Sequence, residues 1–200
     1  IADSMNIIAV KALTQITPQL GYDYLLNFGF TTLESAKEVN GQIYSDITQP
    51  LALGGITNGV TNLELNAAYA TIANNGTCYN LSLLNKVTDS TGNLVEEYGS
   101  TVYNILDVPR EYMSTIQAGM NAYAMNSSAI NNVGIVTAGK TGTAEQSVNH
   151  PNHALFIGYA PYENPEISVS VRIAFGYDSG YAAQTARDVY KYYYGLEEEE

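Results

Sequence analysis

The stretch that decides the fold is Ala138-Gly139-Lys140-Thr141-Gly142-Thr143-Ala144-Glu145-Gln146-Ser147-Val148, which combines one lysine with hydroxyl side chains and glycine. We expect this stretch to form a strand at the edge of a sheet. There Lys140 supplies a point charge, Thr141 and Thr143 donate hydrogen bonds, and Gly142 leaves the backbone bare for an extended substrate. These groups suit a site that holds a carboxylate beside a reacting carbonyl.

The segment Lys140-Thr141-Gly142-Thr143 resembles the third signature of penicillin-binding proteins and serine β-lactamases, whose other two signatures are Ser-x-x-Lys and Ser-x-Asn. Ser4-Met5-Asn6 matches the second signature at a similar separation. Residues 53–61, 67–76 and 156–161 also resemble stretches of the penicillin-binding proteins. The resemblance implies an α+β fold of the penicillin-binding and serine β-lactamase type, in which helices flank an antiparallel sheet.

The first signature of that family is missing from the chain. No serine stands three residues before a lysine, and Ser35-Ala36-Lys37 has the wrong spacing. We therefore expect residues 1–196 to be the C-terminal part of a transpeptidase domain, cut after the segment that holds the nucleophile. Residues 197–200 are expected to be an acidic tail.

The resemblance implies serine acyl transfer from D-alanyl-D-alanine stem peptides and reaction with β-lactams. Ser4 would relay a proton to the leaving nitrogen, and Asn6 would hold the substrate and orient the absent lysine. Lys140 would polarise Ser4 and attract the terminal carboxylate, which the hydroxyls of Thr141 and Thr143 would also bind. The Thr143 N–H would form half of the oxyanion hole. Without its nucleophile, the chain alone is expected to be inactive and unlabelled by β-lactams.

Other functions stay open at this point. A D,D-carboxypeptidase or a serine β-lactamase would use water in place of the acceptor amine, although no convincing deacylating base is present. A non-catalytic module that binds peptidoglycan or a cell-division partner is the alternative from another class. Residues 54–76 resemble bifunctional class A enzymes, whereas 144–146 and 153–156 look more like class B enzymes.

The composition excludes some partners. The chain has a formal net charge of −12 and only 8 lysines and arginines, which argues against nucleic-acid binding. No apolar run approaches the roughly 20 residues of a membrane span. The resemblance implies an extracytoplasmic parent, and we expect its membrane anchor to lie in a segment outside this chain. No cofactor is implied, and His150 and His153 lack the companions of a metal site. Cys78 is single, and we expect an inert thiol in a turn.

Local patterns predict the elements. Five helices are expected. The first runs from residue 4 through Leu13 with Asp3 or Ser4 as its cap, and the second covers 22–28. The third runs from a capping box at Thr61 and Glu64 to Gly76, the fourth starts at Pro109, and the fifth lies near the C-terminus. A hairpin is expected over 81–98, and three antiparallel strands over 135–144, 153–160 and 167–175. The residues expected to pack in the last two helices are Tyr112, Ile116, Met120, Tyr123, Ala186, Val189, Tyr190 and Tyr193. The missing segment would leave an apolar groove that favours dimerisation.

Overall fold

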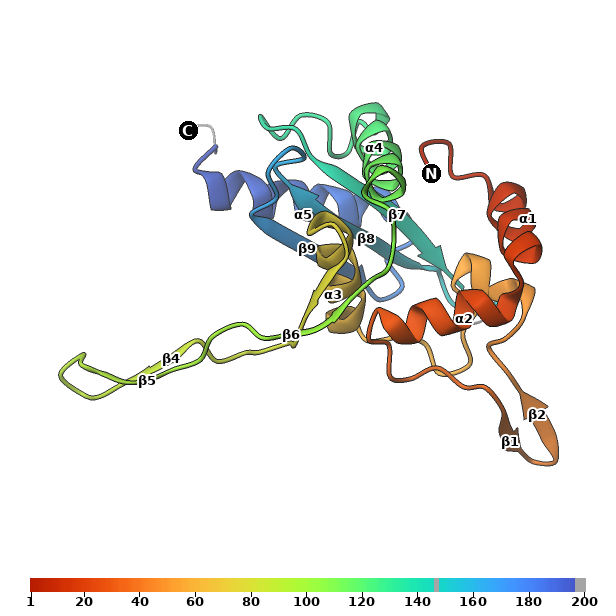
Figure 1. Cartoon of the computed structure of the whole chain (residues 1–200). Coiled ribbons are helices and arrows are strands. Elements are labelled where there is room, and N and C mark those ends of the chain that lie inside the picture. Colours follow the sequence, from red (N-terminus) through yellow and green to blue (C-terminus); the bar gives the residue numbers. More distant parts are fainter. Residues whose placement is uncertain (146–147, 197–200) are drawn as a thin grey trace.

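The computed structural model describes residues 1–145 and 148–196. The helices are α1 (Asn6–Ile16), α2 (Pro18–Asn27), the 3-10 helix η1 (Gln49–Leu53), α3 (Asn62–Ala73), α4 (Arg110–Asn126) and α5 (Ser179–Tyr194). The strands are β1 (Lys37–Val39), β2 (Gln42–Tyr44), β3 (Thr77–Tyr79), β4 (Lys86–Thr88), β5 (Leu94–Glu97), β6 (Val102–Ile105), β7 (Ala138–Ala144), β8 (His153–Ala160) and β9 (Ile167–Ile173). The fold is α+β, as the resemblance implied (Figure 1).

The main sheet is antiparallel with the strand order β7-β8-β9. Nearly every side chain of β8 is buried, because helices cover both faces of the sheet. On β9, Ser168 and Ser170 bond to asparagines of α3, whereas Val169 packs in a core cluster with the alanines of α5. Since alternate residues of a strand face opposite ways, α3 and α5 lie on opposite faces. The three predicted antiparallel strands are confirmed, and β8 is the central one.

The start of α3 follows the predicted capping box. The Thr61 hydroxyl accepts a hydrogen bond from the Glu64 N–H at 3.1 Å, and the Glu64 carboxylate accepts one from the Thr61 N–H at 3.0 Å. Gly76 follows the helix with a φ of 95°, a left-handed conformation that favours glycine. Pro109 also precedes α4 as predicted.

Two predicted helix starts are wrong. The residue that caps α1 is Met5, and neither Asp3 nor Ser4 provides a side-chain cap. Helix α2 begins at Pro18, upstream of the expected residue 22, because the Thr17 hydroxyl accepts from the Leu20 N–H and proline fits the first turn of a helix.

Some side chains expected in the core are exposed. Tyr112 is 60% exposed, and Val189 and Tyr193 also face solvent. On α5 the buried positions are instead Ala182, Ala183, Ala186 and Tyr190. These four residues form the face of α5 that packs in the core, so Val189 and Tyr193 lie on the solvent side of the helix. Cys78 is buried in β3 and does not lie in a turn.

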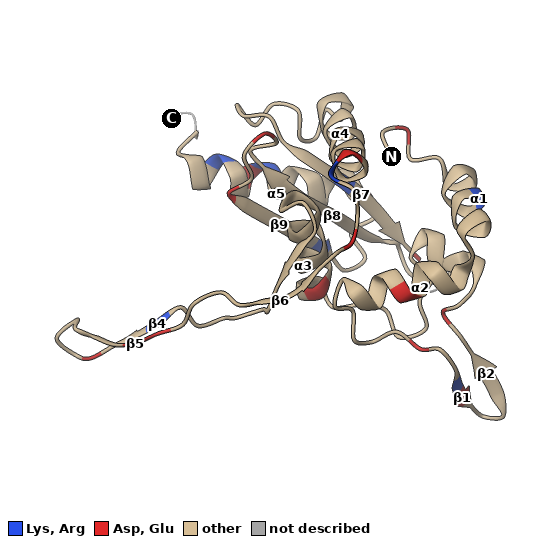
Figure 2. Cartoon of the chain, in the orientation of Figure 1, with Lys and Arg blue, Asp and Glu red and all other residues tan. Residues whose placement is uncertain are grey.

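Two hairpins project from the body. Strands β4 and β5 form the hairpin predicted over 81–98, but the paired part is shorter and lies at the end of a long arm that begins at β3 and β6 (Figure 1). The β1–β2 hairpin was not predicted and projects elsewhere. Lysines and arginines are spread over separate elements (Figure 2). No helix within the described residues is long and apolar enough to cross a bilayer.

Candidate active site

Strand β7 presents the Lys-Thr-Gly-Thr segment at the edge of the main sheet. In the described part of the chain, β7 pairs only with β8, so its outer backbone edge is available to an extended ligand. Lys140 and Gly142 lie opposite Ile157 and Leu155 of β8, on the sheet face that α3 covers. Thr141 alternates to the other face.

Lys140 is half-buried and held by uncharged groups. Its Nζ lies 4.3 Å from the centre of the Tyr123 ring and donates to the Thr141 carbonyl oxygen at 3.1 Å. Burial lowers the pKa of the Lys140 ammonium, because desolvation disfavours the charged form. Among the described residues, no carboxylate forms an ion pair with Lys140. The cation is therefore available to an anionic ligand.

Tyr123 of α4 contacts the site at a second point, because its hydroxyl hydrogen-bonds to the hydroxyl of Thr141. The sequence pattern placed Tyr123 only on a packing face of its helix. No local signal marks it as a site residue, since it lies far from Lys140 along the chain and reaches β7 only through tertiary packing.

An apolar cavity of about 860 Å³ opens between β7 and β8, helices α2 and α3, and the residues around η1. Its lining residues are mainly apolar and include Leu25, Phe28, Phe30, Leu51, Leu53, Ile56, Leu65, Leu155 and Ile157. Lys140 and Arg172 are its cationic side chains, and none of the described residues that line it is an aspartate or glutamate. Although the chain has a net charge of −12, the charged side chains that line this apolar cavity are cationic. Arg172 was not predicted as part of the site.

The two glycines of β7, Gly139 and Gly142, differ in whether the surrounding structure leaves room for a side chain. A Cβ on Gly139 would lie 2.5 Å from Phe156 Cζ and 2.9 Å from the Ile157 carbonyl oxygen, so packing requires glycine there. A Cβ on Gly142 would meet Leu155 Cβ at 3.5 Å, an ordinary contact. Packing within the chain therefore does not require glycine at position 142.

Ser4 and Asn6 do not line the cavity that contains Lys140. Both are exposed at the start of α1, Ser4 has a φ of 52°, and its N–H donates to the Ile1 carbonyl oxygen at 3.1 Å. Ile1 itself lies against Gly119 of α4, the helix that also carries Tyr123. The structure thus places Ile1 beside the same helix, and no described contact joins Ser4 or Asn6 to Lys140.

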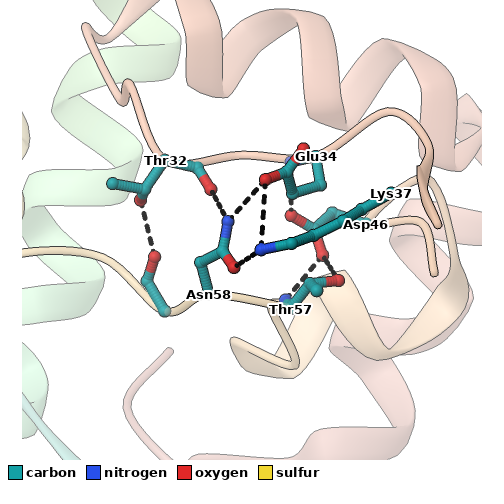
Figure 3. Close-up of polar contacts among 7 residues, drawn as sticks. Thr32, Glu34, Lys37, Asp46, Thr57 and Asn58 are labelled. Atoms are coloured by element: carbon teal, nitrogen blue, oxygen red, sulfur yellow. Dashed lines mark hydrogen bonds and ion pairs between the residues drawn. The ribbon is translucent and has the colours of Figure 1, made fainter. Parts of the chain in front are cut away.

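The cavity wall formed by residues 54–60 is held by a buried carboxylate. Asp46 is 1% exposed, and its two oxygens accept hydrogen bonds from the Thr57 N–H at 2.7 Å, the Thr57 hydroxyl at 2.6 Å and the Glu34 N–H at 2.8 Å (Figure 3). Burial raises the pKa of Asp46, but these bonds outweigh burial and lower it below its usual value.

Asn58, another residue of this wall, joins the same network. Its amide donates to the Glu34 carboxylate at 2.7 Å and to the Thr32 carbonyl oxygen at 3.2 Å, while its own carbonyl oxygen accepts from Lys37 at 2.6 Å (Figure 3). The loop that shapes the cavity is therefore fixed by residues 32–46. Sequence reasoning did not find this network, because its members come from separate loops.

His153 begins β8 as expected and is buried, and its Nδ1 accepts from the Phe175 N–H at 3.1 Å. The described residues contain no group of three or more histidine, cysteine, aspartate or glutamate side chains that could hold a metal ion.

Comparison with known proteins gives consistent matches. The family model described as penicillin binding protein transpeptidase domain matches residues 1–191. Penicillin-binding protein 2A of Bacillus subtilis (strain 168) is 31% identical over 134 residues, which cover 58% of this chain and 19% of that protein. Penicillin-binding protein 1A of Clostridium botulinum (strain Langeland) is 25% identical over 92% of this chain and 21% of that protein.

Solved structures agree in fold. Pseudomonas aeruginosa PBP2 in complex with WCK 5153 matches with a TM-score of 0.76 at 19% identity, covering 96% of this chain and 46% of that one. Penicillin-binding protein A from M. tuberculosis, as an imipenem acyl-enzyme complex, matches with a TM-score of 0.69 at 20% identity, covering 94% and 46%. The chain thus spans about a fifth of its curated relatives and about half of these solved chains.

Proposed function

Because the chain belongs to the penicillin-binding protein transpeptidase domain family, we propose that it supplies the substrate-binding edge of a D,D-transpeptidase that cross-links peptidoglycan stem peptides. The observation that carries this proposal is Lys140, a half-buried cation without an ion-pair partner among the described residues, on an edge strand whose next residues are Thr141, Gly142 and Thr143. An extended stem peptide would pair with this strand through main-chain hydrogen bonds.

Each site residue has a role in this proposal. Lys140 attracts the terminal carboxylate of D-alanyl-D-alanine, and the hydroxyls of Thr141 and Thr143 donate hydrogen bonds to it. The Thr143 N–H provides one donor of the oxyanion hole, a type of interaction worth roughly 3 to 4 kcal/mol in acyl-transfer enzymes. Ser4 delivers a proton to the leaving nitrogen, and Asn6 orients the substrate peptide. These last two roles require the N-terminal segment to approach β7 when substrate is bound.

The nucleophile comes from a Ser-x-x-Lys segment of the parent protein. We place that segment over the apolar cavity, because its lining of leucine, isoleucine and phenylalanine side chains is suited to an apolar face of polypeptide. The serine of this segment attacks the carbonyl and D-alanine leaves, and an amine of a second stem peptide then takes the acyl group. β-Lactams would acylate the same serine. In the absence of that segment, two copies of this chain would associate through the uncovered cavity.

The reaction is proposed to take place outside the cytoplasmic membrane, with the anchor in a part of the parent outside this chain. A D,D-carboxypeptidase would use the same residues with water as the acceptor. The two reactions are separated by their products, because only a transpeptidase joins an added acceptor amine to the donor peptide.

Labelling by a fluorescent penicillin tests the proposal. We expect the parent protein to be labelled and this chain alone to remain unlabelled. In the parent, Lys140→Gln should reduce labelling, whereas Lys191→Gln, on the far helix α5, should not. A parent that contains Ser-x-x-Lys and is never labelled would contradict acyl transfer and would favour a module that only binds peptidoglycan or a partner.

A further inference from the structure

Helix α4 holds Tyr123 firmly beside the edge of β7. Its neighbours Met120 and Ala124 are almost fully buried, so the backbone of this turn is fixed by the core. The side-chain amide of Asn121 donates to the carbonyl oxygen of Thr137 at 2.7 Å, one residue before β7 begins. The position of Tyr123 relative to the strand is therefore set by packing and by a hydrogen bond.

From this place Tyr123 reaches two consecutive residues that point to opposite faces of β7. The face of its ring lies 4.3 Å from Lys140 Nζ, and its hydroxyl bonds to the hydroxyl of Thr141. A lysine side chain carries much rotamer freedom, and the contact with the ring restricts that freedom before a ligand arrives. The bond to Tyr123 likewise restricts the rotation of the Thr141 hydroxyl.

We propose that Tyr123 is a positioning residue that prepares Lys140 and Thr141 together for the carboxylate of the substrate. When Tyr123 donates to the Thr141 oxygen, the hydrogen of the Thr141 hydroxyl is left to donate to that carboxylate, and the two hydroxyls form a chain of donors. The ring keeps the ammonium at the end of the strand where the carboxylate arrives. This inference rests on the proposed function, because it assigns a purpose to the same site.

A packing role alone predicts a different outcome from a positioning role. Phenylalanine has the same ring and fills the same space, so Tyr123→Phe keeps the packing and the contact with Lys140 and loses only the bond to Thr141. Tyr123→Leu also loses the ring. Tyr112, which is 60% exposed on the same helix, provides the matched control Tyr112→Phe.

The test measures acylation of the parent protein by benzylpenicillin and by its neutral methyl ester, which lacks the carboxylate. For Tyr123→Phe we expect acylation by the acid to slow roughly fivefold to tenfold, the effect of losing one hydrogen bond between neutral groups. Acylation by the ester should change less than about twofold. Tyr123→Leu should slow reaction with the acid further, on the order of 100-fold, as the contact with the cation is also lost. Tyr112→Phe should match the wild type.

Each unexpected result would overturn a different part of the proposal. If the wild-type parent reacts with acid and ester at the same rate, the carboxylate site itself is wrong, and the proposed roles of Lys140, Thr141 and Tyr123 are all overturned. If the wild type prefers the acid and Tyr123→Phe keeps that full preference, only the inference about Tyr123 is overturned. Equal slowing with acid and ester would show a structural role and would also overturn it. Thermal melts of the three variants confirm that each one is folded.

Discussion

Alanine substitutions at two glycines of β7 should have opposite effects, although only two residues separate them. At Gly139 the added methyl group would lie 2.5 Å from Phe156 Cζ, 2.9 Å from Phe156 Cε2 and 2.9 Å from the Ile157 carbonyl oxygen. Phe156 is 1% exposed and packed in the core, and the carbonyl belongs to the central strand, so neither can move freely. Overpacking of this kind costs about 1 to 3 kcal/mol, and we expect the upper end.

At Gly142 the same methyl group would lie 3.5 Å from Leu155 Cβ and 3.8 Å from its Cδ1, which are ordinary contacts. The φ of Gly142 is not among the positive values, so alanine adopts this backbone without strain. Alanine also reduces the entropy of the unfolded chain, which stabilises the fold by about 0.4 to 1 kcal/mol. The free energies of unfolding of the two variants should therefore differ by about 3 kcal/mol.

Urea unfolding of this chain, followed by circular dichroism, measures that difference through the midpoint and slope of each transition. Gly142→Ala in the parent protein should nevertheless slow acylation by penicillin, because the methyl group lies where the substrate approaches the strand. The steric reasoning is refuted if Gly139→Ala unfolds within about 0.5 kcal/mol of the wild type. The ligand reasoning is refuted if Gly142→Ala acylates at the wild-type rate.

Further substitutions at three positions test the carboxylates around the cavity and the lysine of the site. Burial raises the pKa of Glu64, but hydrogen bonds from Thr31 and Thr61 outweigh burial and lower it from 4.5 to about 2. The lowered pKa stabilises the fold above about pH 4.5, and this contribution is lost as the pH falls toward 2. Glu64→Gln should therefore lower the free energy of unfolding by about 1 to 2 kcal/mol at pH 7, after allowance for solvent screening. It should also make the free energy of unfolding, measured with urea, depend less on pH between about pH 2 and 4.5. Asp46→Ala leaves buried donors of two loops without an acceptor and should cost about 2 to 4 kcal/mol in the same assay, with Asp46→Asn losing less. Lys140→Met removes a desolvated charge and should leave the melting temperature unchanged or slightly higher while it stops acylation of the parent; a clearly lower melting temperature would show that the lysine serves the fold.

The sequence determined those features that depend on near neighbours along the chain. Short-range strand patterns located β7, β8 and β9, the capping box located the start of α3, and the Lys-Thr-Gly-Thr segment identified the family that the family model confirmed. These signals are local because a strand or a helix cap is formed by residues only a few positions apart. The edge position of β7 followed from the same reasoning.

Tertiary structure decided which side chains meet. Val189 and Tyr193 fit a helical stripe, yet they are exposed because the alanines and Tyr190 form the face of α5 that packs in the core. Tyr123 contacts Lys140 and Thr141 only because α4 packs beside β7, and Asp46 holds the cavity wall only because two loops fold back on it. Such contacts join residues that lie 11 to 18 positions apart in the sequence. The segments between them include loops, in which no periodic sequence pattern indicates the path of the backbone. The sequence therefore predicted the chemical groups of the candidate site, whereas long-range packing decided their positions and partners.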